Sequence, residues 1–217
     1  MRIVKKPEER KAEILDVAER LFTTQGYGQT AVNDILRVLG IAKGTFYHYF
    51  ASKEELLSAI VDRYIAAGTE AAAAVAATTG LTAEEKLRAL IAPPQPAAER
   101  KERMIEEFHR ADNPELHLRS LVETVRRLAP VIGGIVEQGV REGAFSTPYP
   151  RETVELLLTA SQFLLDAGIF PWTGEELSRR ARAFSRLMES ALGAKPGAFA
   201  YVHERYERQP GEAGPIF

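Results

Sequence analysis

The sequence contains no cysteine, which excludes disulfide bridges and thiolate chemistry. It also lacks any apolar run of the ~20 residues that a membrane span requires. Its first residues, MRIVKKPEERK, are charged and do not contain the apolar stretch of a secretory signal peptide. These absences predict a chain that works in the cytoplasm and has no membrane partner.

The sequence has little excess charge of either sign. Its 28 Lys and Arg residues are almost balanced by 30 Asp and Glu residues, giving a net charge of −2. Arg2, Lys5 and Lys6 nevertheless form a basic arm, and no acid occurs between Lys43 and Lys53. Because non-specific affinity for nucleic acid comes mainly from phosphate neutralisation, we expect few ionic contacts from any interface built here.

No segment shows the alternation of a β-strand, and no internal repeat is visible. Helical spacing of apolar residues recurs along the chain instead. We therefore predict an all-α fold of about nine helices, spanning residues 8–25, 31–38, 42–49, 53–77, 82–92, 97–111, 114–143, 151–168 and 173–193. Pro130 and Gly133–Gly134 predict a kink or break in the seventh of these helices.

The segment Thr30–Glu55 has the pattern of a helix-turn-helix. At about 100° per residue, one arc of its second helix is apolar and predicts contact with a core: Ala42, Phe46, Tyr49 and Phe50. The remaining arc carries side chains suited to phosphates and base edges: Lys43, Gly44, Thr45, Tyr47 and His48. Gly inside a helix costs roughly 1 kcal/mol relative to Ala, and close approach to another surface is a reason to accept that cost.

The flanks of this segment indicate the same unit. Thr30 is placed to cap the first helix, and Gly40 permits the sharp turn after it. Ser52 and Glu55 form a capping box for the following helix. That box brings the Lys53 amine to a helix N-terminus, an arrangement suited to binding phosphate.

The helix at 151–168 is apolar nearly all round. Such a helix is buried on nearly all sides, which in a chain of this size favours burial partly against a second subunit. The Pro- and Gly-rich tail from Lys195 is either loose or docked through Phe199, Val202 and Tyr206.

Two stretches carry a family resemblance. GIAKGTFYHYFASKEEL (Gly40–Leu56), preceded by AEILDVAERLFTTQGY (Ala12–Tyr27), resembles the TetR/AcrR family of bacterial transcriptional regulators. The resemblance covers residues 8–60. It departs from the family at Ala42, where many relatives have Ser or Thr, so a capping hydroxyl is missing.

The resemblance implies an Ω-shaped homodimer that represses transcription from a palindromic DNA operator and is released by a small effector. It implies a helix-turn-helix domain at 1–52, a ligand-binding and dimerisation domain at 53–195 and a tail at 196–217. It also implies that Lys43, Thr45, Tyr47 and His48 contact the operator, and that Lys53 and the region around Thr30 hold phosphates.

For the effector we expect a largely apolar molecule with one polar end, and no cofactor. The candidate pocket residues are apolar or polar side chains at helical spacing: Met104, Phe108, His109, Leu121, Val125, Leu158, Gln162 and Phe163.

Two rival interpretations stay open. An enzyme could use Glu106 and His109, whose i, i+3 spacing occurs in metal-carboxylate bundles, but no second E-x-x-H occurs to complete such a site. We therefore predict neither a metal site nor an enzyme. The other rival is a ligand-independent DNA-binding protein with a filled C-terminal core.

Overall fold

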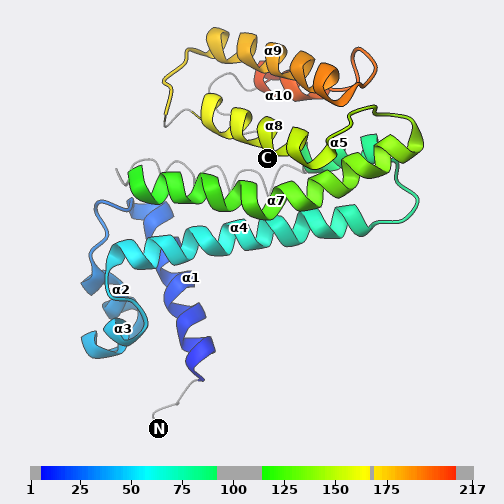
Figure 1. The fold of residues 1–217 in the computed structure, drawn as a ribbon. Coiled ribbons are helices and arrows are strands. Elements are labelled where there is room, and N and C mark those ends of the chain that lie inside the picture. Colours follow the sequence, from blue (N-terminus) through cyan, green and yellow to red (C-terminus); the bar gives the residue numbers. More distant parts are fainter. Residues whose placement is uncertain (1–5, 92–113, 167–168, 209–217) are drawn as a thin grey trace. The chain divides into compact units, whose positions relative to one another are not determined.

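The computed structural model describes residues 6–91, 114–166 and 169–208 (Figure 1). Within these residues it contains nine helices and no strand, which confirms the all-α prediction. The helices are α1 (Pro7–Gln25), α2 (Val32–Leu39), α3 (Lys43–Tyr49), α4 (Lys53–Ala77), α5 (Ala83–Ile91), α7 (Pro114–Glu142), α8 (Pro150–Leu164), α9 (Gly174–Leu192) and α10 (Ala200–Arg208). The predicted helix at 97–111 lies outside the described residues.

The chain divides into two compact units. The described residues of the N-terminal unit are 6–64 and 114–117, and those of the C-terminal unit are 65–91, 118–166 and 169–208. Both α4 and α7 contribute residues to each unit. None of the described helices is both long and apolar enough to cross a membrane.

The core of the N-terminal unit is made by the apolar sides of α1 to α4. Its fully buried side chains recur at helical spacing: Ile14, Ala18, Phe22, Ile35, Phe46, Leu56, Leu57 and Ile60. The turn between α2 and α3 depends on Gly40, whose φ of 63° lies in the left-handed region that side chains disfavour.

An ion-pair cluster joins α4 to α1 beside this core. Arg63 donates to Asp16 Oδ1 (2.7 Å) and to the carboxylate of Glu19, and Tyr64 donates its hydroxyl to Glu19 Oε1 (2.6 Å). Glu19 is buried. A buried carboxylate requires such partners because desolvation penalises its charge, so this cluster holds the angle between the two helices.

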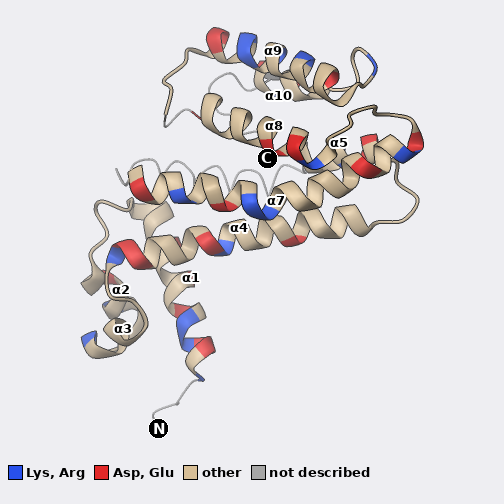
Figure 2. Cartoon of the chain, viewed as in Figure 1, with Lys and Arg blue, Asp and Glu red and all other residues tan. Residues whose placement is uncertain are grey.

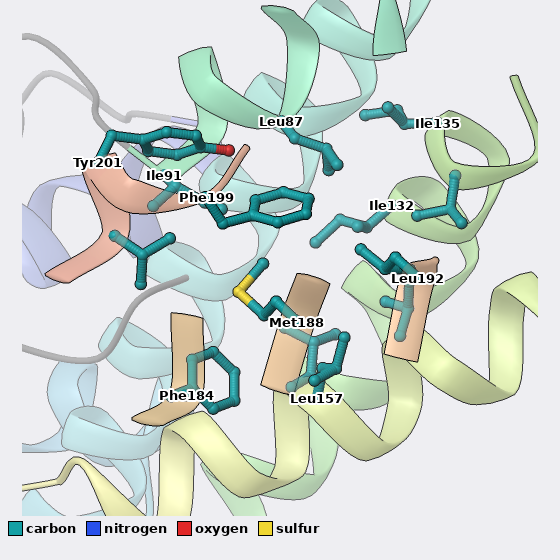
Figure 3. Packing of buried hydrophobic residues seen from close by; sticks show 14 of the residues in the cluster. Leu87, Ile91, Ile132, Ile135, Leu157, Phe184, Met188, Leu192, Phe199 and Tyr201 are labelled. Atoms are coloured by element: carbon teal, nitrogen blue, oxygen red, sulfur yellow. The ribbon is translucent and has the colours of Figure 1, made fainter. Parts of the chain in front are cut away.

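The C-terminal unit has its own core, built from α5, α7, α8, α9 and α10 (Figure 3). Met188 of α9 lies among side chains that include Ile132 of α7 and Phe199 of the turn before α10. Only a void of about 10 Å³ is left between Leu87, Ile132, Leu158 and their neighbours. This part of the C-terminal core is therefore filled.

The prediction for the seventh helix was a kink or a break, and the break does not occur, since α7 runs from Pro114 to Glu142 with Pro130 inside it. Two glycines of α7 serve packing instead. A Cβ at Gly133 would lie 3.3 Å from Arg151 Cα, and one at Gly139 would lie 2.2 Å from the Phe145 ring. These glycines let the start of α8 and the α7–α8 connection approach the α7 backbone closely.

The described part of the tail, which ends at Arg208, docks on the C-terminal unit, and residues 209–217 lie outside the described residues. Phe199, Val202 and Tyr206 are buried, and the helix α10, which was not predicted, packs against α9. Two hydrogen bonds fix the turn before it: Ser185 Oγ donates to Phe199 O (2.7 Å), and Gly197 N donates to Glu189 Oε1 (2.7 Å). Of the two alternatives left open for this tail, docking is therefore the correct one for the residues up to Arg208.

Candidate nucleic-acid interface and ligand groove

The helix α3 presents to solvent most of the side chains predicted for its polar face. Phe46 is fully buried and Phe50 is 2% exposed, so these rings anchor one side of the helix. On the other side Lys43, Gly44 and His48 are exposed, Tyr47 is 45% exposed and Thr45 is half-buried. Figure 2 shows a basic stretch and no acidic one on α3. The face therefore offers hydrogen-bonding groups without a repelling carboxylate.

The helical wheel misplaced one residue of this helix. Ala42 was expected in the core but is exposed, because it is the N-cap with extended backbone (φ −72°, ψ 151°) and precedes the first helical turn. Its side chain makes no capping bond, as expected from the missing hydroxyl.

Nothing in the described chain explains the glycine at position 44. A Cβ built on Gly44 meets no heavy atom within 4 Å, and the residue has ordinary helical backbone. The glycine therefore neither relieves a clash nor permits a turn in the free protein. Two physical reasons for it stay open: close approach of another surface, and tolerance of a poor helix former on an exposed face.

Thr30 is wrong as a helix cap, and its side chain is turned away from solvent. The helix α2 has Ala31 as its N-cap, and the Thr30 hydroxyl donates to Gly26 O (2.8 Å) instead. The side chain is 1% exposed, so it cannot reach a phosphate from this position.

Ser52 caps α4 as predicted, since Glu55 N donates to Ser52 Oγ (3.1 Å). The other half of the box differs, because the Glu55 carboxylate accepts from Ala51 N (2.6 Å). Two backbone N–H groups at the start of α4, those of Ala51 and Glu55, thus have side-chain acceptors.

The Lys53 amine is held inside the unit. Its Nζ donates to Tyr27 O (2.9 Å) and Thr30 O (3.1 Å) and lies 4.2 Å from the centre of the Tyr27 ring. These contacts tie the start of α4 to the loop between α1 and α2. Spacing alone could not show this, because the partners are carbonyls 23 and 26 residues away.

Tyr27 is a positioning residue that the sequence interpretation missed. Its ring packs edge-on against Phe22 and its hydroxyl lies 3.5 Å from Glu54 Oε1. Burial, with the nearby Glu54 charge, raises the pKa of Tyr27 to about 12. The tyrosine therefore stays neutral and supports the cation of Lys53 above its ring.

A half-open groove of about 250 Å³ lies between α7 and α8 in the C-terminal unit. Four predicted pocket residues line it together: Leu121, Val125, Gln162 and Phe163. Sequence reasoning missed its other lining residues, Leu118, Val122, Arg126 and Thr159. Leu158 does not line this groove, since it points into the filled core and is fully buried. Met104, Phe108 and His109 lie outside the described residues.

The apolar face of α8 is not buried all round. Leu156 is 73% exposed and Leu164 is 39% exposed, while Leu157 is in the core at 6%. On α9, which contacts α8, Leu187 is 51% exposed. The two neighbouring helices thus leave leucines in solvent that the chain itself does not cover in the described residues.

Comparison with known proteins identifies the family of this chain. A family model described as bacterial regulatory proteins of the tetR family matches residues 14–60, and a model of a tetracyclin repressor-like C-terminal domain matches residues 97–187. The transcriptional repressor KstR2 of Rhodococcus jostii is 30% identical over 145 residues, covering 63% of this chain and 68% of that repressor. The chain belongs to the tetR family. The tetR family consists of transcriptional regulators, so the prediction that this chain is not an enzyme is confirmed.

Another relative matches a shorter stretch of the chain. The regulator EthR of Mycolicibacterium smegmatis is 40% identical over 58 residues, which is 27% of each protein. The chain thus spans about a quarter of the length of that relative. A tetR-family regulator from Mesorhizobium loti shares the fold, with a TM-score of 0.58, 20% identity and coverage of 86% of this chain and 98% of the other.

Proposed function

We propose that this chain is a homodimeric transcriptional repressor that binds a palindromic operator in the cytoplasm and is released by a small, largely apolar effector. The observation that carries the proposal is the exposed face of α3 in a tetR-family chain. Lys43, Tyr47 and His48 offer the charge, the hydroxyl and the ring nitrogens that phosphates and base edges accept.

The leucines on α8 and α9 support the dimer. From Leu156, steps of four residues lead to Ala160 and Leu164, and from Leu187 one step leads back to Ala183, so each helix has an apolar stripe. Pairing these stripes with a second copy removes them from water, at roughly 25 cal/mol per Å² of apolar surface. Binding of both α3 helices of a two-fold dimer to successive major grooves requires a separation of about one turn of DNA.

The groove between α7 and α8 supports the effector. It is lined mainly by apolar side chains with a few polar groups, which is typical of small-molecule sites. The ligand acts only if it binds the two states of the dimer unequally, and such coupling is typically about 1–3 kcal/mol. The filled core around Leu158 supports the rival, a ligand-independent DNA-binding protein.

The test of DNA binding is the double variant Lys43→Ala, Tyr47→Ala. We expect it to abolish binding to intergenic DNA beside the gene, measured by mobility shift, and to leave the dimer intact by light scattering. Lys53 is left unchanged, because its loss would also disturb the loop that it holds.

The matched control is Arg20→Ala, which removes one exposed cation from α1. We expect its affinity for the same DNA to match the wild type. Equal binding by the wild type and the double variant would refute the interface.

A thermal-shift screen tests the effector, because a ligand that binds the folded state raises the melting temperature. A hit should also release DNA, and Leu121→Trp, which fills the groove, should remove both effects. A screen in which no compound stabilises the protein would favour the ligand-independent rival.

A further inference from the structure

Gln162 is the polar group that the groove leaves unsatisfied. Its side chain is 4% exposed, it lines the groove, and within the described residues the structure shows no hydrogen-bond partner for its Nε2. Buried amide groups are normally paired, since an unpaired donor loses its bonds to water without replacement. The position therefore calls for an acceptor that the described residues do not supply.

The other polar groups of the groove narrow the chemistry of that acceptor. The Thr159 hydroxyl donates to Glu155 O (2.8 Å), so its proton is already used. Arg126 donates Nη1 to Glu123 Oε1 (3.1 Å), and a guanidinium has five N–H groups, so donors remain for a ligand. None of the eight lining residues is a carboxylate. The groove therefore suits a ligand that accepts hydrogen bonds and disfavours a cation.

The apolar lining residues of the groove indicate the chemistry of the part of the ligand that lies away from Gln162. Leu118, Val122 and Phe163 are 61%, 48% and 48% exposed, and each lines the groove. A volume of about 250 Å³ is far larger than the roughly 10–15 Å³ that one water molecule requires. A short hydrocarbon chain fits this space.

From these observations we infer that the groove binds a short acyl compound, whose carbonyl oxygen accepts from Gln162 Nε2 while its alkyl chain lies along the α7 leucines and valines. This inference rests on the proposed function, because it names the effector class for the same groove. A carboxylate and a neutral amide share this carbonyl chemistry, and Arg126 favours the carboxylate.

The chain carries its own reporter of binding. Trp172 is the only tryptophan. Its ring stacks on Phe170 (5.1 Å between centres), and Phe170 contacts Phe163 edge-on at 5.6 Å. Because Phe163 lines the groove, a ligand there changes the surroundings of the tryptophan.

The experiment compares three probes with the same chain length: octanoate, octanamide and octylammonium. Each is titrated into the full-length protein, with Trp172 fluorescence and melting temperature as readouts. We expect octanoate to bind at least tenfold more tightly than octylammonium, with octanamide between them. Gln162→Leu should weaken octanoate about tenfold.

Gln162→Glu supplies the reverse control, since it replaces a donor with a carboxylate. We expect it to lose octanoate and to gain octylammonium. If this variant fails to fold, the comparison of the wild type with Gln162→Leu still decides. Three results would overturn the acyl assignment. They are equal affinity for the three probes, no binding of any probe, and an octanoate affinity that Gln162→Leu leaves unchanged.

Two further outcomes separate this inference from the proposed function. If octanoate binds through Gln162 but does not release DNA, the acyl site stands and the effector role fails. If another class of compound releases DNA and Leu121→Trp blocks it, the effector groove stands and the acyl assignment fails. A change of oligomeric state in Gln162→Leu would make the groove an interface between copies and overturn the inference.

Discussion

Gly44 is the residue at which we expect one substitution to have opposite effects on protein stability and on DNA affinity. In the isolated chain its Cβ position is empty space, so alanine fits and should favour the helix. Against DNA the same methyl group would occupy the space that a close backbone approach requires. The two effects of one methyl group therefore have opposite signs.

We predict that Gly44→Ala raises the free energy of unfolding by up to about 1 kcal/mol while it lowers affinity for the operator at least tenfold. Denaturant unfolding and mobility shift measure the two quantities. Gly68→Ala is the matched control, because Gly68 is also exposed, helical and free of neighbours within 4 Å. It should stabilise the protein without changing DNA affinity. Wild-type binding by Gly44→Ala would contradict the account.

At the residue scale the sequence predicted exposure well where helical spacing applied. Phe46 and Phe50 are buried while Tyr47 and His48 are exposed, as the wheel predicts. The sequence did not predict the hydrogen bonds of the Thr30 and Lys53 side chains, because their partners are backbone carbonyls that tertiary folding brings near. Side chains that bond to distant backbone leave no periodic signal.

Among the elements, α5 is held at its start by α7. Glu142 accepts from Ala83 N (2.9 Å) and from Gln138 Nε2 (2.6 Å), and these bonds, the backbone one first, hold the pKa of its carboxyl below the usual range. A carboxyl with a lowered pKa in the folded state contributes stability above its ordinary pKa of about 4.3. That contribution is lost as the pH falls through the lowered value.

We therefore predict that Glu142→Gln melts below the wild type at neutral pH, and that the difference shrinks as the pH is lowered from about 6 to 3. Glutamine keeps an acceptor for Ala83 N–H but does not titrate. Melting temperatures over this range measure the effect, with Glu137→Gln, an exposed acid on the same helix, as the control. A difference that stays constant with pH would show that the Glu142 charge has no such role.

Adjacent residues of α8 allow the proposed dimer to be tested apart from folding, because Leu156 is exposed and Leu157 is buried. Leu156→Asp, on the exposed side, should abolish the dimer and leave helix content unchanged, by light scattering and circular dichroism. Leu157→Asp buries a charge in the core and should unfold the C-terminal unit. Leu118→Asp, another exposed leucine, should stay dimeric. A dimer that tolerates Leu156→Asp would refute the interface.

The helix bounds were predictable to within a residue or two where caps mark them, as at the Thr173–Glu176 box that starts α9. The continuity of α7 was not predictable, because a proline followed by Gly133 and Gly134 is a pattern typical of a helix break. The sequence does not show that Gly133 packs closely against Arg151. The groove was predicted in part, since lining residues share helical spacing with core residues. Periodicity cannot distinguish a side chain that faces empty space from one that faces another side chain.

For the whole molecule, the proposed dimer would convert a seven-residue helix into a specific regulator. One α3 reads a few base pairs, whereas two related by a two-fold axis read an inverted repeat with a defined spacing. A ligand that changes this spacing changes DNA affinity without touching the interface. The central claim is therefore that two α3 faces bind one duplex together.

Selection of bound sequences from a random duplex library tests this claim most directly. We predict that the wild type enriches an inverted repeat whose half-site centres lie about one helical turn, 34–36 Å, apart, bound by two chains, and that Lys43→Ala, Tyr47→Ala enriches nothing. Enrichment of no sequence by the wild type, or of the same repeat by the double variant, would contradict it.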